Sequence, residues 1–453
     1  QTTEKLKALQ KQSGGWPWFE GMRESRFITQ HIVAGFGQLN QLGIIDFQKN
    51  NEINQMLTKA IQFLDEEILL DYERLKAIKN IDLDKDHVSH FQIHYIYMRS
   101  FFQQIELPDK IKEAYQYYYH QSKTYWLQKG KYQQGQIALA VHRNNEKEIP
   151  AKIIASLKEF AIQSDELGMY WKENYESPYW YDAPIEMHAL MIELFQTLGR
   201  QNEVDELKIW LLKQKQTNHW TSTKSTVDAV YSLLLGNKYL ISEPKISIAI
   251  GDEKINLMQE KTEAGTGYFK QNWMKNEINP NFGHIVVESQ QENISWGAVY
   301  WQYFDDISNI EGNKTSLSID KRIYKKEMTN NGIVLKPFLE TNIHLGDKII
   351  VQLKVKSDRD LEFVHLKDMR ATGFEPLNTI SGYRYDNGVG YYQSTKDISQ
   401  NFFFDRLPKG TYTFEYEEVV NQKGNYTSGI ATIQCLYAPE FSSNSKSFNI
   451  KVD

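Results

Sequence analysis

Apolar residues follow two different spacings along the chain, and the change between them falls near Gly236. Before that point they recur three and four positions apart, as between Phe27 and Leu42, which is the spacing of one face of an α-helix. The segments with this spacing cover residues 27–42, 56–64, 88–98, 153–161, 184–198, 204–215 and 223–235. We therefore predict a helical region over the first half of the chain.

After Gly236 apolar residues alternate with polar ones, which is the spacing of a half-buried β-strand. The alternating segments are KISIAIG (245–251), HIVVES (284–289), SWGAVYWQYF (295–304), SLSIDKRIYKK (316–326), KIIVQLKVKS (348–357), EFVHLKD (362–368), NFFFDRL (401–407), YTFEYEEVV (412–420) and SGIATIQCLYA (428–438). Turn residues separate them at intervals of roughly 10–20 residues, which favours a β-sandwich for the last part of the chain.

Turns that contain tryptophan precede several of the predicted helices. They are GGWPWFEGMRES (14–25), GMYWKENYESPYWYDAP (168–184) and TNHWTSTKS (217–225). In each, a Ser, Thr or Asp can cap the helix while the indole seals the turn. Trp171 and Trp220 lie 49 positions apart, which suits a helical hairpin, and such hairpins must stack to bury their apolar faces. We predict an α/α array, closed as a ring or open as a solenoid.

Composition and charge exclude several classes of protein. The 453 residues carry a net charge of −6, whereas a nucleic-acid binder normally shows a basic stripe. No run of 18 or more apolar residues predicts a transmembrane helix. Cys435 is the only cysteine, so no disulfide can form within the chain. The chain opens on QTTEKLKALQ, a helix-like segment without an export signal, and we expect a longer parent protein.

Several segments, taken in order, resemble the bacterial α2-macroglobulin family, and the nearest forms are the long Bacteroidetes-type members. WYDAPIEMHALMIELF (180–195) and WLLKQKQTNHWTSTKSTVDAVYSLLLG (210–236) resemble its thioester-type helical domain. AGTGYFKQNW (264–273) and SWGAVYWQYFDDI (295–307) resemble the small β segment that follows. DMRATGFEPLNTISGY (368–383), LPKGTYTFEYE (407–417) and SGIATIQCLYAPEFSSNS (428–445) resemble the last macroglobulin-like domain, and they are the most specific of these motifs.

The resemblance implies a multidomain α plus β fold in the C-terminal part of such a protein. Residues 1–238 would form an α/α toroid, residues 239–315 a small CUB-like β domain, and residues 316–453 a macroglobulin-like β-sandwich. It also implies an exported, periplasmic or cell-envelope location and a role in trapping proteases after a bait segment is cut. The expected partners are target proteases and the other macroglobulin domains of the same parent. No catalysis and no cofactor are expected.

Thioester-bearing members of the family carry a Cys-x-Glu-Gln motif, and Cys435 does not fit it. Ala438 stands where the motif needs Gln, and Cys435 lies in an alternating segment. We therefore predict an ordinary buried thiol. In the family the motif would lie before the GGWPWF stretch, upstream of Gln1, and whether the parent has it stays open.

His87, His90 and His94 are the candidate metal ligands. Their spacing of three and four would place all three on one face of a helix. No HExxH motif accompanies them, and neighbouring Phe91 and Tyr95 favour a packing role instead. We expect no bound metal.

A second candidate site consists of aromatic side chains from the turns, which could line a cleft if the array closes. They are Trp16, Trp18, Trp171, Trp180, Tyr181 and Trp220. An aromatic cleft suits sugar rings, so a polysaccharide lyase or glycosidase is one alternative, and a purely structural interaction module is another. Asp182, Glu186 and His188 could supply acid–base chemistry there, or could simply cap the helix that Pro184 begins. The plainest interpretation is that the tryptophans plug the turns.

Overall fold

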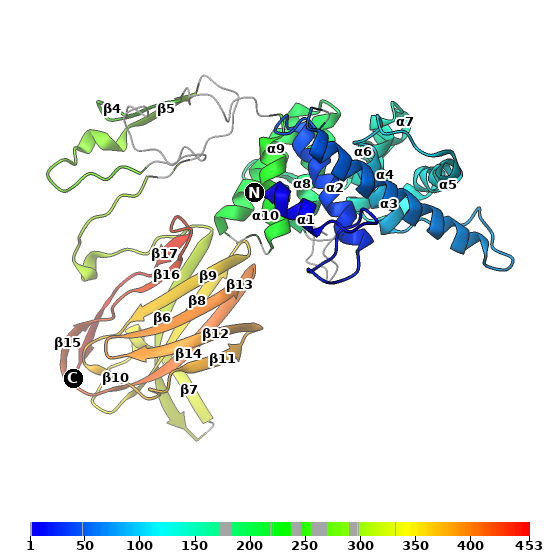
Figure 1. Ribbon diagram of the computed structural model, residues 1–453. Helices are drawn as coiled ribbons and strands as arrows, with labels where there is room; N and C mark the ends of the chain where they lie inside the picture. Colours follow the sequence, from blue (N-terminus) through cyan, green and yellow to red (C-terminus); the bar gives the residue numbers. More distant parts are fainter. Residues whose placement is uncertain are drawn as a thin grey trace. The chain divides into compact units, whose positions relative to one another are not determined.

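We describe a computed structural model of the chain, which covers residues 2–47, 49–171, 184–217, 220, 222–236, 246–255, 270–289, 297, 299–330 and 332–453. The chain divides into two compact units. The first contains Gln1–Leu211 and Trp220–Ser295, and the second contains Leu212–His219 and Trp296–Asp453. Figure 1 shows helices gathered in the first unit and a two-layered β-structure in the second. An α plus β fold is confirmed.

Ten α-helices are described, and seven of them overlap the segments that the apolar spacing predicted. The ten are α1 (Thr2–Leu9), α2 (Arg26–Gln41), α3 (Asn51–Lys76), α4 (His90–Arg99), α5 (Asp109–Tyr125), α6 (Lys131–Arg143), α7 (Glu148–Glu159), α8 (Pro184–Thr197), α9 (Gln201–Thr217) and α10 (Thr223–Leu234). Ser25, Asn50, Ser89 and Ser222 cap α2, α3, α4 and α10, each accepting a bond from a backbone N–H of the first turn. Within these ranges, no helix is both long and apolar enough to cross a bilayer.

Alternate helices form an inner layer in which α2, α4, α6, α8 and α10 contact one another in succession. Every residue of α8 from Ile185 to Phe195 is buried, and so is every residue of α6 from Gly135 to Val141. Two glycines allow the close approach: a β-carbon at Gly37 would lie 2.5 Å from Phe101, and one at Gly135 would lie 2.9 Å from Met191. This alternation of inner and outer helices is what an α/α array requires, and closure into a toroid stays a prediction.

A largely buried polar cluster joins the five inner helices. Arg143 of α6 donates to Glu193 of α8 at 2.5 Å and to the amide oxygen of Gln41 of α2 at 3.1 Å. Tyr97 of α4 donates to the other oxygen of Glu193 at 2.8 Å. Tyr231 of α10 donates to the Gln41 oxygen at 3.2 Å. Through Gln41 the last inner helix is therefore hydrogen-bonded to the first.

The small β part of the first unit is a three-stranded antiparallel sheet of order β4-β3-β5, formed by β3 (Ile246–Ile250), β4 (Glu253–Ile255) and β5 (Ile285–Ser289). A short hairpin, β1 (Ile162–Ser164) with β2 (Gly168–Tyr170), lies among the helices. The strand predicted over SWGAVYWQYF is wrong for its described residues, 297 and 299–304, which form no strand and are exposed. Alternation predicts which side chains share a face, but a strand also needs a partner, and the described residues provide none here.

The second unit is a β-sandwich. Its strands are β6 (Leu317–Thr329), β7 (Gly332–Pro337), β8 (Lys348–Ser357), β9 (Leu361–Met369), β10 (Phe374–Pro376), β11 (Gly382–Asp386), β12 (Val389–Lys396), β13 (Ser399–Leu407), β14 (Gly410–Val420), β15 (Gly424–Thr427), β16 (Ala431–Cys435), β17 (Ser442–Asn444) and β18 (Asn449–Val452). One sheet has the order β10-β14-β8-β6-β7 and the other β11-β12-β13-β9-β16-β17, while β15 pairs with β18. Side chains of both sheets, such as Tyr391, Phe402 and Phe414, meet in one apolar core.

Two buried ion pairs cross the interior of this sandwich. Lys321 lies 2.6 Å from Asp368, which also accepts from Tyr416 at 2.5 Å. Arg370 lies 2.9 Å from Glu418, and all four charged side chains are almost fully removed from solvent. Burial raises the pKa of Glu418 to about 7, although Lys321 and Arg370 act to lower it. The neutral acid is therefore favoured more strongly in the folded domain than in the unfolded chain.

Removing one partner of the buried helical cluster should strongly destabilise the first unit. In Glu193→Ala the guanidinium of Arg143 would stay buried without its carboxylate, and such losses cost about 3–5 kcal/mol. Urea unfolding followed by the helical circular dichroism signal measures the change. The matched control is Glu52→Ala, which breaks the exposed Lys7–Glu52 pair and should cost below about 1 kcal/mol. Equal losses in the two variants would contradict the role assigned to the cluster.

The sandwich should lose stability as the pH rises between the two pKa values of Glu418. Over most of the range from pH 5 to 7.5, Glu418 holds a proton in the folded domain but has released it in the unfolded chain. Through Glu418, the free energy of unfolding should therefore fall by about 2 kcal/mol over this range. Glu418→Gln should remove that part of the pH dependence. Denaturant unfolding followed by the near-ultraviolet signal at a series of pH values tests this. An unchanged slope in the variant would show that Glu418 does not titrate in this range.

Candidate functional site

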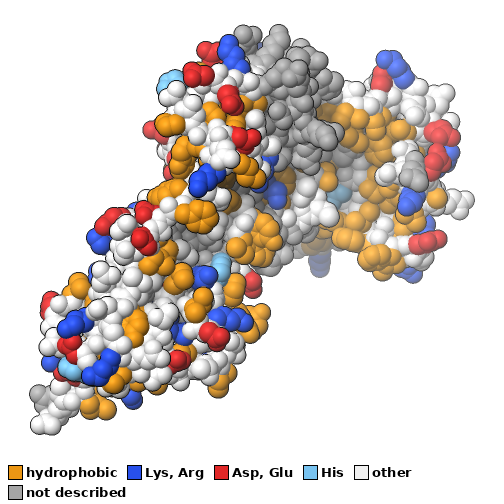
Figure 2. All heavy atoms as spheres, turned by 90° about the vertical axis from the view of Figure 1, so that its left-hand side faces the viewer, with side chains coloured by type: hydrophobic (Ala, Val, Ile, Leu, Met, Phe, Trp, Pro, Cys, Tyr) orange, Lys and Arg blue, Asp and Glu red, His pale blue; other side chains and the backbone are white. Residues whose placement is uncertain are grey.

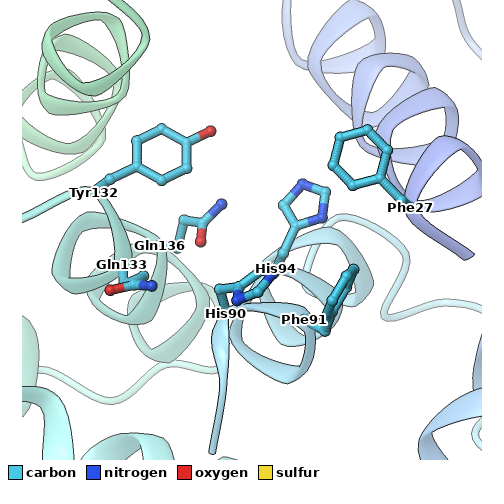
Figure 3. Close-up of a pocket in the computed structure, with 7 residues that line it drawn as sticks. All are labelled: Phe27, His90, Phe91, His94, Tyr132, Gln133 and Gln136. Carbon is cyan, nitrogen blue, oxygen red and sulfur yellow. The ribbon is translucent and has the colours of Figure 1, made fainter. Parts of the chain in front are cut away.

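A small hollow lies where the first turns of α4 and α6 meet the start of α2. Its lining, drawn in Figure 3, consists of Phe27, His90, Phe91, His94, Tyr132, Gln133 and Gln136. Serine caps set the first turns of α2 and α4, which places Phe27, His90 and Phe91 at the rim. The hollow measures about 10 Å³, which is room for one water molecule.

His94 lies at the centre of this site, and its ring is buried. Gln30 lies with its amide nitrogen 3.0 Å from Nδ1 of His94, and the ring of His31 lies 4.7 Å from that of His94. Burial lowers the pKa of His94 to about 3, and it lowers the pKa of His31 well below the ordinary value. Burial therefore favours the neutral form of both imidazoles, in which each ring has one N–H donor and one acceptor nitrogen.

A second polar group connects the start of α8 with α10. Glu186 accepts from Ser225 at 2.7 Å and from Ser222 at 3.4 Å, so the capping serine of α10 is tied to α8. Lys224 forms an ion pair with Asp228 one turn along the same helix. Burial raises the pKa of Asp228. Burial alone would lower the pKa of Lys224, but the nearby Tyr132 and Asp228 outweigh it, and the pKa of Lys224 is raised. The bonds of Glu186 therefore hold α8 and α10 together, whereas the Lys224–Asp228 pair lies within α10.

The three candidate metal ligands do not share a helix, so the predicted arrangement is corrected. Ser89 and Gln92 form a capping box that starts α4 at His90, and His87 lies before it. His87 instead has its Nε2 atom 2.8 Å from the backbone carbonyl of Asp82. Across the described part of the chain, no cluster of three or more His, Cys, Asp or Glu side chains could hold a metal ion.

The candidate cleft tryptophans lie in different environments. Trp16 is 1% exposed and donates to the carbonyl of Leu6 at 2.7 Å, and Trp171 is 2% exposed and donates to the carbonyl of Leu157 at 2.9 Å. Both indoles therefore seal their turns. Trp18 is 56% exposed and stacks on Phe27 at 5.4 Å. Trp220 packs partly buried against the helical core, and Trp180 and Tyr181 lie outside the described residues.

The remaining candidate groups are also occupied by structural contacts. Cys435 is buried, its thiol lies 3.2 Å from the carbonyl of Glu362, and burial raises its pKa. Glu186 faces α10, whereas the Nε2 atom of His188 lies 2.8 Å from the carbonyl of Leu207 of α9. The two residues thus point to different faces of α8 and form no acid–base pair, while Asp182 lies outside the described residues.

Charges of both signs are mixed on one face of the molecule. On the face shown in Figure 2, Lys and Arg side chains alternate with Asp and Glu, and hydrophobic side chains lie between them in small groups.

Sequence reasoning missed the polar residues that bring the inner helices together. Tyr132, Gln136 and Arg143 lie on α6, a helix that the apolar spacing did not predict. Its sequence KYQQGQIALAVHR begins with six residues that include no aliphatic side chain, so only its second half shows the aliphatic character of a buried helix. The signal that could have revealed it was helix propensity, since Lys, Gln, Ala and Leu all favour helices.

Acidification should destabilise the helical unit through His94. The pKa of His94 lies near 3 in the folded protein and near 6.5 in the unfolded chain. Between these two values a proton binds His94 only in the unfolded chain, so the free energy of unfolding falls as the pH falls. Lowering the pH from 7 to 5 should cost about 2 kcal/mol through this side chain. Helical unfolding in urea at both pH values should show that loss reduced in His94→Gln. The exposed control His120→Gln should keep the full loss; the same reduction in both variants would contradict the assignment.

Comparison with known proteins relates the second unit to one family. Residues 317–440 match the model of the bacterial α2-macroglobulin MG10 domain. Escherichia coli α2-macroglobulin activated by porcine elastase is a similar structure, at 13% identity and a TM-score of 0.39, over 99% of this chain and 38% of that one. Native E. coli α2-macroglobulin from domain MG7 to the C-terminus is similar at 12% identity and a TM-score of 0.33, over 99% and 66% of the respective chains.

A curated relative, circularly permutated Ras protein 2 of Dictyostelium discoideum, is 24% identical over 111 residues, which are 24% of this chain and 3% of that protein. The chain thus spans less than two thirds of the length of each of these proteins. On the match over its β-sandwich, the chain is bacterial α2-macroglobulin-like and carries the MG10 domain of that family at residues 317–440.

Proposed function

We propose that this chain is a non-catalytic scaffold within an exported bacterial α2-macroglobulin-like inhibitor of proteases, located in the periplasm or at the cell envelope. The observation that carries the proposal is the MG10 match over residues 317–440. In an inhibitor of this kind a protease cuts a bait segment, the domains shift, and the protease is trapped. The chain would hold or cover the reactive region of the same parent protein.

The geometry of the helical unit supports holding rather than catalysis. Its hollow has room for one water molecule, and the imidazole of His94 at its centre is neutral. Trp16 and Trp171 seal turns, and the carboxylate of Glu186 bonds the serines of the next inner helix. Each of these groups stabilises the arrangement of the helices, which is the property that a scaffold needs.

The parent protein should protect large substrates from a protease while small substrates are still cut. After incubation with the full-length parent, trypsin should cleave a large protein substrate at least about tenfold more slowly. It should still cleave a small chromogenic peptide at more than about half the original rate. The reason is that a trapped protease keeps its active site but is sterically enclosed. Measuring both rates on one sample tests the proposal.

The control is a parent sample first cut to completion by elastase, which has already used its bait segment and should no longer protect the large substrate from trypsin. Equal loss on both substrates would indicate an active-site inhibitor instead. Unchanged cleavage of both substrates would show that the parent does not trap trypsin, and the proposal would then be wrong for this protease class.

A further inference from the structure

The β-sandwich contains a groove at its open side, between the edge of β14 in one sheet and β11 in the other. It has a volume of about 310 Å³ and is lined by Pro376, Leu377, Asn378, Arg384, Gln393, Glu415, Tyr416 and Glu417. Its position follows from the short strand β10, which pairs with only Glu418–Val420 of β14. Pro376 is the last residue of that strand, and Leu377 after it adds one more backbone bond to β14. The rest of this edge of β14 has no partner strand among the described residues.

Two bonds mark the ends of the open part of the edge. The carbonyl of Glu417 accepts from the backbone N–H of Leu377 at 3.0 Å, and the carbonyl of Thr413 accepts from the side-chain amide of Asn387 at 2.7 Å. Backbone groups in a strand alternate from side to side, so residues 413, 415 and 417 all direct their N–H and C=O toward this edge. Glu415 is therefore the residue between the two bonds whose backbone N–H and C=O both face the groove.

The side chains that face the groove supply one positive charge and one amide. Arg384 and Gln393 share the inward face of their strands with Tyr391, because Arg384 pairs with Tyr391 and Gln393 lies two residues after it. Gln393 is only 7% exposed. Neither the guanidinium of Arg384 nor the amide of Gln393 has a hydrogen-bond partner among the described residues.

The acidic residues in the lining do not cancel this charge. Residues 415 and 417 point their side chains to the opposite face of β14 from the core residue Phe414. There Glu415 accepts from Gln352 at 2.8 Å, and Glu417 forms an ion pair with Lys326. The charge that faces the groove is therefore that of Arg384.

We propose that this groove binds a short extended peptide segment with an acidic side chain. One residue of the peptide would exchange two backbone hydrogen bonds with Glu415, as a residue of an added strand does. The residue next to it in the peptide would carry the acidic side chain, because side chains alternate along a strand and this neighbour lies on the inner face, where its carboxylate would accept from Arg384 and Gln393 would bond the adjoining peptide group. The inference does not depend on protease trapping, because it rests on the β-sandwich alone.

Calorimetric titration of the full chain with acetyl-Val-Glu-Val-amide tests the site. We expect saturable binding of this peptide and at least about tenfold weaker binding of acetyl-Val-Lys-Val-amide, since a charge-assisted bond to arginine would be replaced by repulsion. Methylation of the backbone nitrogens of both valines should weaken binding by a similar factor, because one of these residues would pair with Glu415 and its N–H would donate to the carbonyl of Glu415. No binding of the acidic peptide, or equal binding of the three peptides, would overturn the proposal.

Variants of the chain separate the groove from general surface charge. Arg384→Ala should weaken binding of the acidic peptide at least about tenfold, and Arg384→Lys should weaken it less because the charge remains. The matched control is Arg406→Ala, which removes an exposed arginine of the same sandwich that pairs with Asp360, and it should leave binding within about twofold. Equal effects at positions 384 and 406 would show that the peptide binds by surface charge and not in the groove.

Discussion

The guanidinium of Arg143 is largely enclosed by side chains of α2, α4 and α8, and the arrangement of the helical unit follows from how that charge is satisfied. A buried charge without a partner is too costly to persist, so Glu193 must remain within reach of Arg143. Gln41 accepts from both Arg143 and Tyr231, which connects α2 to α10 through the same group. The β-sandwich meets the same requirement with Lys321 and Asp368, which join the two sheets. In both units, the position of separate elements depends on the pairing of charges that water cannot reach.

The helices with wide apolar stripes could be predicted from the sequence, and those with mixed faces could not. The predicted segments at 27–42 and 184–198 match α2 and α8 to within a residue or two. α5 was missed because its buried face is formed largely by tyrosine and small residues, as in DKIKEAYQYYYHQSKTY. The aromatic segment after residue 295 shows the opposite error, since its alternation resembles that of a strand although the described residues there pair with nothing. Periodicity indicates which side chains share a face and says nothing about the partner that covers it.

The candidate site was harder to predict, because its chemistry depends on contacts between distant residues. Arg143 and Glu193 are 50 positions apart and lie on helices with no sequence motif in common. The spacing of His87, His90 and His94 suggested a shared helical face, but a local capping box decided where the helix begins. The tryptophans of the turns carry the same ambiguity. The motif GGWPWF contains both Trp16, which is buried, and Trp18, which is exposed, and only the packing around them distinguishes the two roles.

The edge of β14 also bears on how the sandwich avoids association with copies of itself. An uncovered edge strand can pair with other chains and grow into an extended sheet, which is a common route to aggregation. Here the side chain of Asn387 occupies one carbonyl and the backbone of Leu377 occupies another, and only the backbone of Glu415 stays available between them. A ladder limited to a single residue cannot propagate along the strand. The same two bonds that define the groove therefore protect this edge from pairing with another sheet while leaving space for one short ligand.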